Sequence, residues 1–218
     1  MKDTLYTAIR QTYYRHLRPR LPRKIGVYNG YPARKPKLFD RVDVDPDWEA
    51  PFIESIQDVV AEGDTVVVVG GGFGISTVAA ATKSGPDGRV ISYEASKSRY
   101  KCAQETIELN GVSGRVTLKH ALVGPDIAVK GDLGGASAVT PSNLPDCDVL
   151  ALDCEGAELD IIERLGPTPR EIVVESHGCF DAPTQAVRET LEQNEFTVIN
   201  ELEDNPKCGI DILTAASK

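Results

Sequence analysis

The stretch Asp64-Thr-Val-Val-Val-Val-Gly-Gly-Gly-Phe-Gly-Ile-Ser-Thr77 decides the fold of this chain. Its four consecutive valines, 66 to 69, suit a strand that is buried on both faces in the middle of a parallel sheet. The glycines that follow let the backbone turn sharply and let a ligand approach main-chain N–H groups. Residues 75–81 are typical of a helix start, whose N-terminus then points at that ligand. Strand, glycine loop and helix in this order predict the opening unit of a nucleotide-binding α/β domain.

The spacing of the glycines separates two classes of cofactor. Gly70, Gly72 and Gly74 form G-x-G-x-G, whereas the dinucleotide fingerprint G-x-G-x-x-G needs a glycine at position 75, which is Ile75. The spacing therefore points away from NAD and toward S-adenosylmethionine. A purely structural turn, in which the glycines serve close packing alone, is the alternative that the loop by itself leaves open.

Length and composition describe one ordinary domain with an extension. The chain has 218 residues, enough to bury a full core. No apolar run approaches the roughly 20 residues that span a bilayer, and the N-terminus has no apolar leader, so we expect a cytoplasmic protein. The five cysteines include no C-x-x-C pair, which argues against a disulfide framework and a zinc site. We expect them to be small buried side chains.

Charge divides the chain into two parts. Residues 1–42 hold eleven Lys and Arg against two Asp and Glu, a balance of +9, so the remainder carries −18 and the whole chain −9. We expect a basic extension over 1–42, with a helix at 4–17 and short strand pieces at 26–28 and 37–39, followed by a main domain over 43–218. Such an arm suits nucleic acid, an anionic membrane surface or the acidic body of the same protein. The tyrosine-rich helix also leaves a homodimer open.

Beyond the glycine loop, strand and helix patterns alternate, which predicts a doubly wound, mostly parallel α/β sheet. The last two strands are joined by a short turn without a helix and should pair as an antiparallel closing hairpin. A helix capped by Asp47 is expected at 48–61, ahead of the first sheet strand. The seven expected strands are 66–69, 89–94, 115–120, 148–152, 171–175, 196–201 and 209–215, with a further short piece at 127–129.

Polar residues gather where these strands end, which is where ligands bind in an open α/β sheet. Glu94 lies 24 positions after Gly70 and can accept hydrogen bonds from both hydroxyls of a ribose. The alternative for Glu94 is a carboxylate that caps the next helix.

The run Asp153-Cys-Glu-Gly-Ala-Glu158 places three carboxylates within six residues at another strand end. They repel one another, so a cationic guest would stabilise them: the sulfonium and ammonium of S-adenosylmethionine, or a divalent metal. For Glu158, a position in the first turn of the next helix is the alternative. The fifth strand ends in Glu175-Ser-His177, and His177 has the ordinary pKa range of a general base. A histidine bonded to a neighbouring carbonyl is its structural alternative.

The glycine loop, Glu94 and above all residues 148–158 followed by 172–177 resemble the FkbM-like branch of class I S-adenosylmethionine-dependent methyltransferases, over roughly residues 49–200. The discriminating part is D-x-E-G-x-E followed by a strand that ends in E-x-H, because the loop alone fits any class I methyltransferase. The resemblance implies a seven-stranded Rossmann-like sheet and O-methylation, commonly of a hydroxyl on a sugar or other small molecule.

The resemblance also implies roles for individual positions. Gly70, Gly72 and Gly74 would border the methionine and ribose portions of the cofactor, and Glu94 would bind the ribose. His120 and Ala121 would flank the adenine, Asp153 would lie near the methyl-donor end, and Glu49 matches an acidic residue often found before the first strand. One position departs from the family: Val68 stands where an acidic residue is common, and Glu49 is expected to substitute in part.

We therefore expect an O-methyltransferase in which a hydroxyl attacks the methyl group in line with sulfur. His177 and Asp153 are the candidate catalytic residues, because a base near the hydroxyl proton would accelerate the attack. No metal is expected, since an isolated acidic cluster is not a defined ligand spacing. Metal assistance through Asp153, Glu155 and His177 is the alternative.

Other functions stay open at this stage. An RNA-directed methyltransferase steered by the basic arm is disfavoured by the acidic body. A non-catalytic binding module is motivated by Val68, and an NAD-dependent oxidoreductase is disfavoured by Ile75 and by the lack of a Tyr-x-x-x-Lys pair after the fourth strand. The expected partner is a small-molecule or glycan acceptor, without nucleic acid and without a membrane span.

Overall fold

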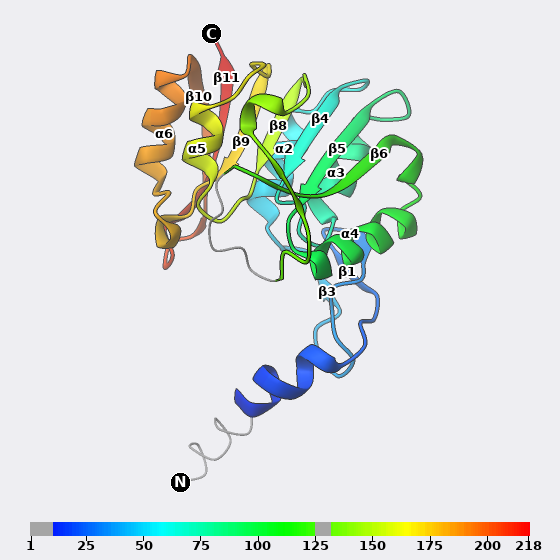
Figure 1. Cartoon of the computed structure of the whole chain (residues 1–218). Coiled ribbons are helices and arrows are strands. Elements are labelled where there is room, and N and C mark those ends of the chain that lie inside the picture. The colour runs from blue at the N-terminus through cyan, green and yellow to red at the C-terminus, as the bar shows by residue number, and fades with distance from the viewer. Residues whose placement is uncertain (1–10, 125–131) are drawn as a thin grey trace.

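An eight-stranded sheet forms the centre of the computed structural model, which describes residues 11–124 and 132–218 (Figure 1). The strand order is β10-β11-β9-β8-β4-β5-β6-β7. All neighbours are parallel except β11, which is antiparallel to both β9 and β10. The strands are β4 (Thr65–Val69), β5 (Arg89–Glu94), β6 (Val116–Val123), β7 (Ser137–Val139), β8 (Val149–Leu152), β9 (Glu171–Glu175), β10 (Phe196–Asn205) and β11 (Ile210–Ser217).

This topology confirms the doubly wound parallel sheet and its antiparallel closing hairpin. The sheet has one strand more than the seven expected, because β7 pairs with the edge of β6. That strand is three residues long and contains two exposed positions, so it carries no hydrophobic alternation from which to predict it. The piece expected at 127–129 and residues 4–10 of the expected N-terminal helix lie outside the described residues.

Helices cover both faces of the sheet and bury the two sides of β4 against different partners. Val66 and Val68 pack with α2 (Ala50–Val59), α3 (Ile75–Lys83) and α4 (Lys97–Leu109). Val67 and Val69 pack with α5 (Glu158–Glu163) and α6 (Thr184–Gln193). All four valines are at most 4% exposed, as the run of consecutive valines predicts for a strand between two layers. None of the helices in the described part of the chain has the length and apolar character needed to cross a membrane.

The first turn of α2 differs from the expectation of a helix at 48–61 capped by Asp47. The helix begins at Ala50, and the preceding residue, Glu49, has left-handed backbone geometry with a φ of 47°. Trp48 packs edge-on against Tyr28 at a ring distance of 6.0 Å, which holds it outside the helix. The predicted Asp47 cap is therefore wrong, and the backbone turns at Glu49 instead.

The basic arm forms a small sheet of its own, in the order β2-β1-β3. Its strands are β1 (Gly26–Tyr28), β2 (Tyr31–Ala33) and β3 (Val44–Asp45), so the third strand lies beyond the expected boundary at 42/43. The piece expected at 26–28 is confirmed. The piece expected at 37–39 is wrong, because Lys37 makes only an isolated bridge and Phe39 has a φ of 73°.

The arm is attached to the body through α4. Arg34 donates its backbone N–H to Thr106 Oγ1 at 3.2 Å and forms an ion pair with Glu105 at 3.1 Å. Asn110 donates from Nδ2 to the carbonyl of Pro32 at 2.8 Å. The two short helical turns Tyr13–Leu17 and Arg18–Arg20 lie apart from the sheet in Figure 1.

An ion pair at the opposite end of the sheet joins the start of β4 to the start of β9. Arg170 donates from both terminal nitrogens to Asp64, at 2.8 and 3.2 Å, and Ala61 N–H donates to the same carboxylate at 2.7 Å. Burial works to raise the pKa of Asp64, but the bonds from Arg170 and Ala61 outweigh it and the pKa is lowered.

We predict that Asp64→Asn lowers the free energy of unfolding by about 1–2 kcal/mol at pH 7, because it removes the charge from a nearly buried, doubly bonded carboxylate. The folded-state pKa lies below the unfolded one, so the difference should be present above about pH 4 and shrink as the pH falls through the folded-state value. Urea unfolding at pH 7 and pH 3 measures it. Arg164→Ala, which removes an exposed ion pair with Asp160, is the control and should change stability by less than about 0.5 kcal/mol.

Candidate active site

The glycine loop is held by close packing on one side and is open on the other. Gly70 has a φ of 87°, and a Cβ atom there would lie 1.7 Å from the carbonyl oxygen of Asp153. A Cβ on Gly74 would come within 2.9 Å of Ala103 Cα. Gly72 differs, since the nearest atom to its added Cβ lies at 3.8 Å. Packing therefore requires the first and last of these glycines, while Gly72 leaves room for a ligand.

Glu94, at the end of β5, binds the glycine loop directly. It is 4% exposed, and its carboxylate accepts the N–H of Gly72 at 2.7 Å and that of Ser96, just before α4, at 2.6 Å. Burial raises its pKa in spite of these bonds. A carboxylate has lone pairs beyond the two in use, so Glu94 retains the capacity to accept ribose hydroxyls while it orders the loop.

Two adjacent cavities lie above the carboxyl ends of the parallel strands. A narrow one is lined by the ends of β4, β5 and β6, including Tyr93, Glu94 and Ala121. A wide one, with about 640 Å³ of space, is lined by the glycine loop, Glu49, Glu175 and His177. The residues that line both are Gly70, Arg99, Asp153 and Glu155.

The structure thus gathers most of the expected site residues around these two adjacent cavities. The expected residues that line one or both cavities are Gly70, Gly72, Glu94, Ala121, Asp153, Glu49 and His177. Two of the described residues that were expected to bind the cofactor line neither cavity. Gly74 packs on α4, and His120 contacts the carbonyl of Ala95 at 3.1 Å and the ring of Tyr100 at 5.2 Å.

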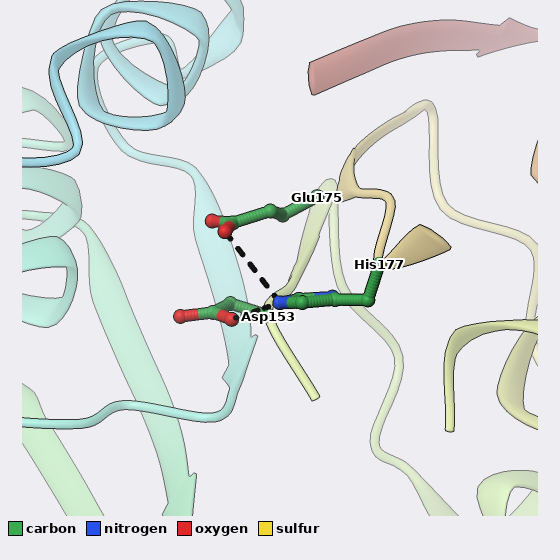
Figure 2. A group of neighbouring side chains, drawn as sticks. All are labelled: Asp153, Glu175 and His177. Carbon is green, nitrogen blue, oxygen red and sulfur yellow. Dashed lines mark ion pairs between the residues drawn. The ribbon is translucent and has the colours of Figure 1, made fainter. Parts of the chain in front are cut away.

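Three ionisable side chains converge on the wall of the wide cavity, as Figure 2 shows. His177 Nε2 lies 3.5 Å from Asp153 Oδ1 and 3.5 Å from Glu175 Oε1. Asp153 follows β8, Glu175 ends β9, and His177 stands two residues further on. We call these three side chains the Asp-Glu-His cluster.

A fourth carboxylate fixes the orientation of the histidine. Glu158, at the start of α5, is fully buried and accepts His177 Nδ1 at 2.9 Å. The same carboxylate accepts the N–H groups of Cys154 at 2.9 Å and Gly156 at 2.8 Å. Each oxygen of the carboxylate accepts one backbone N–H, so Glu158 is an acceptor toward the ring as well. In the neutral imidazole, Nδ1 then carries the proton and Nε2 presents its lone pair to the cluster.

Burial makes the charge of this region costly. Burial and neighbouring carboxylates raise the pKa of Glu175 to about 10 and that of Glu49 to about 8. Burial also raises the pKa of Asp153 to about 6, against the lowering effect of His177. Burial opposes a charge on His177 as well, but the bond from Glu158 and the nearby carboxylates outweigh it and its pKa is raised. The site thus favours uptake of a proton or another cation.

Glu175 and Glu158 are the residues of the candidate site whose contacts the sequence did not reveal. Glu175 reads as the last residue of a buried strand, and Glu158 as a helix-start carboxylate. The sequence signal that they share is a carboxylate directly after an apolar, buried segment. A carboxylate is seldom buried without a partner, so this position indicates a specific contact. Glu155, which the sequence grouped with Asp153 and His177, has left-handed backbone geometry and pairs with Arg99 at 3.4 Å instead.

Val68 points away from the site. It is fully buried in the apolar layer that contains Phe52, Ile56 and Val78. The carboxylate that orders the glycine loop in this protein is Glu94, which bonds Gly72 from the neighbouring strand. Glu49 lines the wide cavity beside the loop.

Comparison with known proteins identifies the fold. No family model matches the chain. Ribosomal protein L11 methyltransferase of Bacillus pumilus (strain SAFR-032) is 40% identical over 68 residues, which are 31% of this chain and 21% of that protein. The chain thus spans about a fifth of that relative's length.

Solved structures extend the likeness to most of the chain. The ribosomal protein L11 methylase of Lactobacillus delbrueckii subsp. bulgaricus has a TM-score of 0.58 at 18% identity, over 80% of each chain. An O-methyltransferase of Thermotoga maritima has a TM-score of 0.56 at 21% identity, over 80% of this chain and 66% of its own. TYW2 of M. jannaschii in complex with AdoMet has a TM-score of 0.55 at 15% identity, over 90% and 86%.

The chain has the fold of class I S-adenosylmethionine-dependent methyltransferases. The FkbM-like branch within that class stays a prediction.

We predict that Gly70→Ala and Gly72→Ala differ sharply in their effect on stability. Both place a side chain at positive φ, which costs about 1–2 kcal/mol. Gly70→Ala also drives Cβ into the backbone of Asp153, so its loss in free energy of unfolding should exceed that of Gly72→Ala by about 2 kcal/mol or more. Urea unfolding of both variants measures the difference, and equal losses would contradict the packing described above.

We also predict that Glu158→Gln lowers the free energy of unfolding by about 2–3 kcal/mol, because the amide cannot accept all three donors that the buried carboxylate accepts. Histidine ¹⁵N chemical shifts should show that His177 loses its fixed Nδ1–H form. Glu163→Gln, on the exposed side of the same helix, should change neither quantity. A Glu158→Gln protein with an unaltered His177 spectrum would show that Glu158 does not set the tautomer.

Proposed function

We propose that this protein is an S-adenosylmethionine-dependent O-methyltransferase that acts on a hydroxyl of a sugar or other small molecule. The observation that carries the proposal is the placement of the Asp-Glu-His cluster in the wide cavity, directly beside the open face of the glycine loop. The class I methyltransferase fold supports the same cofactor, and the neighbour from M. jannaschii was solved in complex with AdoMet.

The narrow cavity and the loop suit the methyl donor. Apolar walls from Tyr93, Ala121 and neighbouring residues would enclose the adenine. His120 would not contact the adenine directly but would support Ala95, whose carbonyl it contacts. Glu94 would accept the ribose hydroxyls while it holds Gly72. Gly70 and Gly72 would border the ribose and methionine portions, with Gly74 supporting the turn. The sulfonium would lie near Asp153 and Glu49, whose negative charge stabilises a cation.

The wide cavity suits the acceptor. Its volume of about 640 Å³ falls in the range of small-molecule sites. Five carboxyl groups and one arginine line it, a set that can hydrogen-bond the hydroxyls of a sugar. The carboxyl groups are Glu49, Asp153, Glu155, Glu175 and Asp204, and the arginine is Arg99. This excess of acidic groups favours a sugar or another small molecule over the phosphates of RNA.

The proposed chemistry is a single displacement. The acceptor oxygen attacks the methyl carbon, the carbon–sulfur bond breaks, and S-adenosylhomocysteine leaves with the bonding electron pair. The hydroxyl loses its proton to the cluster, where His177 Nε2 presents a lone pair and Asp153 stands 3.5 Å away. Alignment of oxygen, carbon and sulfur supplies most of the rate, and proton removal adds about 10²–10⁴-fold.

Calorimetric titration of the full chain with S-adenosylmethionine, S-adenosylhomocysteine and NAD tests the donor site. We expect micromolar binding of the first two and none of NAD. Glu94→Ala should weaken binding by about 10–100-fold, because it removes charge-assisted bonds to the ribose. Glu108→Ala on the outer side of α4 is the control. No binding of any of the three would favour a protein without methyltransferase activity.

Formation of S-adenosylhomocysteine with a panel of sugars and small alcohols, ribosomal RNA and ribosomal protein tests the acceptor. Turnover with the sugars or alcohols alone supports the proposal, and turnover with RNA or protein alone overturns the acceptor class. His177→Ala should lower kcat by about 10²-fold or more while the Kd for S-adenosylmethionine stays within about twofold.

A further inference from the structure

The geometry of the Asp-Glu-His cluster matches a metal-binding site more closely than a set of paired side chains. One ligand atom from each of Asp153, Glu175 and His177 lies within 4.8 Å of the other two (Figure 2). The two distances from His177 Nε2 are both 3.5 Å, too long for strong hydrogen bonds. Ligand atoms about 2.1 Å from one ion, at tetrahedral or octahedral angles, are roughly 3.0–3.4 Å apart. The two distances from His177 Nε2 are therefore close to the separations that a shared ion imposes.

Glu175 supplies a second and independent observation. Its residue is only 6% exposed, yet in the described part of the chain its carboxylate accepts no hydrogen bond, and its one close polar contact is the His177 ring. Other buried carboxylates of the site behave differently. Glu94 and Glu158 each accept two backbone N–H groups. Buried carboxylates are almost always satisfied, and Glu175 lines the wide cavity, so it has the capacity to bind a further partner from that cavity.

The hydrogen bond between His177 Nδ1 and Glu158 is of the kind found at metal-binding histidines. Glu158 accepts the proton of Nδ1, so the lone pair of Nε2 faces the oxygens of Asp153 and Glu175. A ring nitrogen and two carboxyl groups that face one point form an arrangement that a cation between them would stabilise. A carboxylate behind the ligating imidazole is the usual outer shell of a histidine–metal bond.

We propose that Asp153, Glu175 and His177 bind one divalent transition-metal ion, of the Mn²⁺ or Zn²⁺ type, in the wall of the wide cavity. The donor set of one imidazole nitrogen and two carboxylates decides the class of ion. Mg²⁺ and Ca²⁺ prefer oxygen ligands alone, whereas imidazole suits the transition metals and carboxylate suits manganese.

The ion would change how the cluster acts on an acceptor. Three protein ligands leave coordination positions free for a hydroxyl that enters from the cavity. A hydroxyl bound to a divalent ion releases its proton far more readily than a free one. His177 and Asp153 would then act on the hydroxyl through the ion rather than by accepting its proton themselves. This consequence rests on the proposed function, whereas binding of the ion does not.

Binding is measured on the full chain, freed of metal by EDTA and dialysis, at high salt to screen the acidic surface. Titration with MnCl₂ is followed by the electron paramagnetic resonance of free Mn²⁺. We expect one ion per chain at micromolar affinity. Electron spin echo modulation of the bound Mn²⁺ should show coupling to one imidazole ¹⁴N, a test that needs no variant. ZnCl₂ should release the Mn²⁺, because the Irving–Williams order favours zinc.

Variants locate the ion. His177→Asn, Glu175→Gln and Asp153→Asn should each weaken Mn²⁺ binding by about tenfold or more, and the outer-shell Glu158→Gln by about 10–100-fold. Glu171→Gln is the matched control, since it makes the same change at the other end of β9, where Glu171 pairs with Arg170. Circular dichroism of each variant checks that the protein is folded.

Three results would overturn the site: no saturable Mn²⁺ binding, no ¹⁴N coupling, or equal release of Mn²⁺ by CaCl₂ and ZnCl₂. Unchanged affinity in the folded His177→Asn variant would also exclude it. S-adenosylmethionine binding without Mn²⁺ binding would leave the proposed function standing and remove this proposal. The reverse result would remove the methyltransferase and leave the metal site.

Discussion

The contact between Gly70 and the backbone of Asp153 is the constraint on which the arrangement of the site depends. Asp153 N–H donates to the carbonyl of Val69 at 3.0 Å, which continues the pairing of β8 with β4 to the last residue. The Asp153 carbonyl then occupies the space that a side chain at position 70 would need. The glycine loop and Asp153 of the Asp-Glu-His cluster are thus in direct backbone contact. The distance between them is therefore set by the packing of the sheet and not by flexible loops.

Carboxylates are concentrated where the sheet offers few cations, and the protein stabilises them in two ways. Glu94 and Glu158 are satisfied by main-chain N–H groups from the turns that they hold. Asp153 and Glu175 pair with His177 and face the cavity, where they are available to a bound ligand. The first pair therefore builds the site, and the second pair stays reactive toward a guest. The segment between β8 and α5 contributes to both pairs, since it contains Asp153 and leads into Glu158.

Much of the fold could be predicted because the decisive signals are local. A run of valines and a glycine loop predict β4 and the turn to α3, and strand–helix alternation predicts the parallel sheet. The edge strand β7 and the start of α2 could not be predicted, since they depend on tertiary pairing with β6 and on packing of Trp48 against Tyr28. Strand ends indicated the region of the site. The bond from Glu158 to His177 spans 19 positions and follows from the fold, not from any spacing.

The outermost strand of the sheet has a consequence for assembly. One edge of β10 pairs with β11, and exposed residues along it include Asn200, Glu201 and Glu203. Like charges on an edge strand oppose the approach of a second, identical edge. The central sheet is therefore protected from growing into a continuous ribbon across molecules at this end. Two copies that met at this edge would bring their Glu203 side chains together, which disfavours strand-mediated aggregation there.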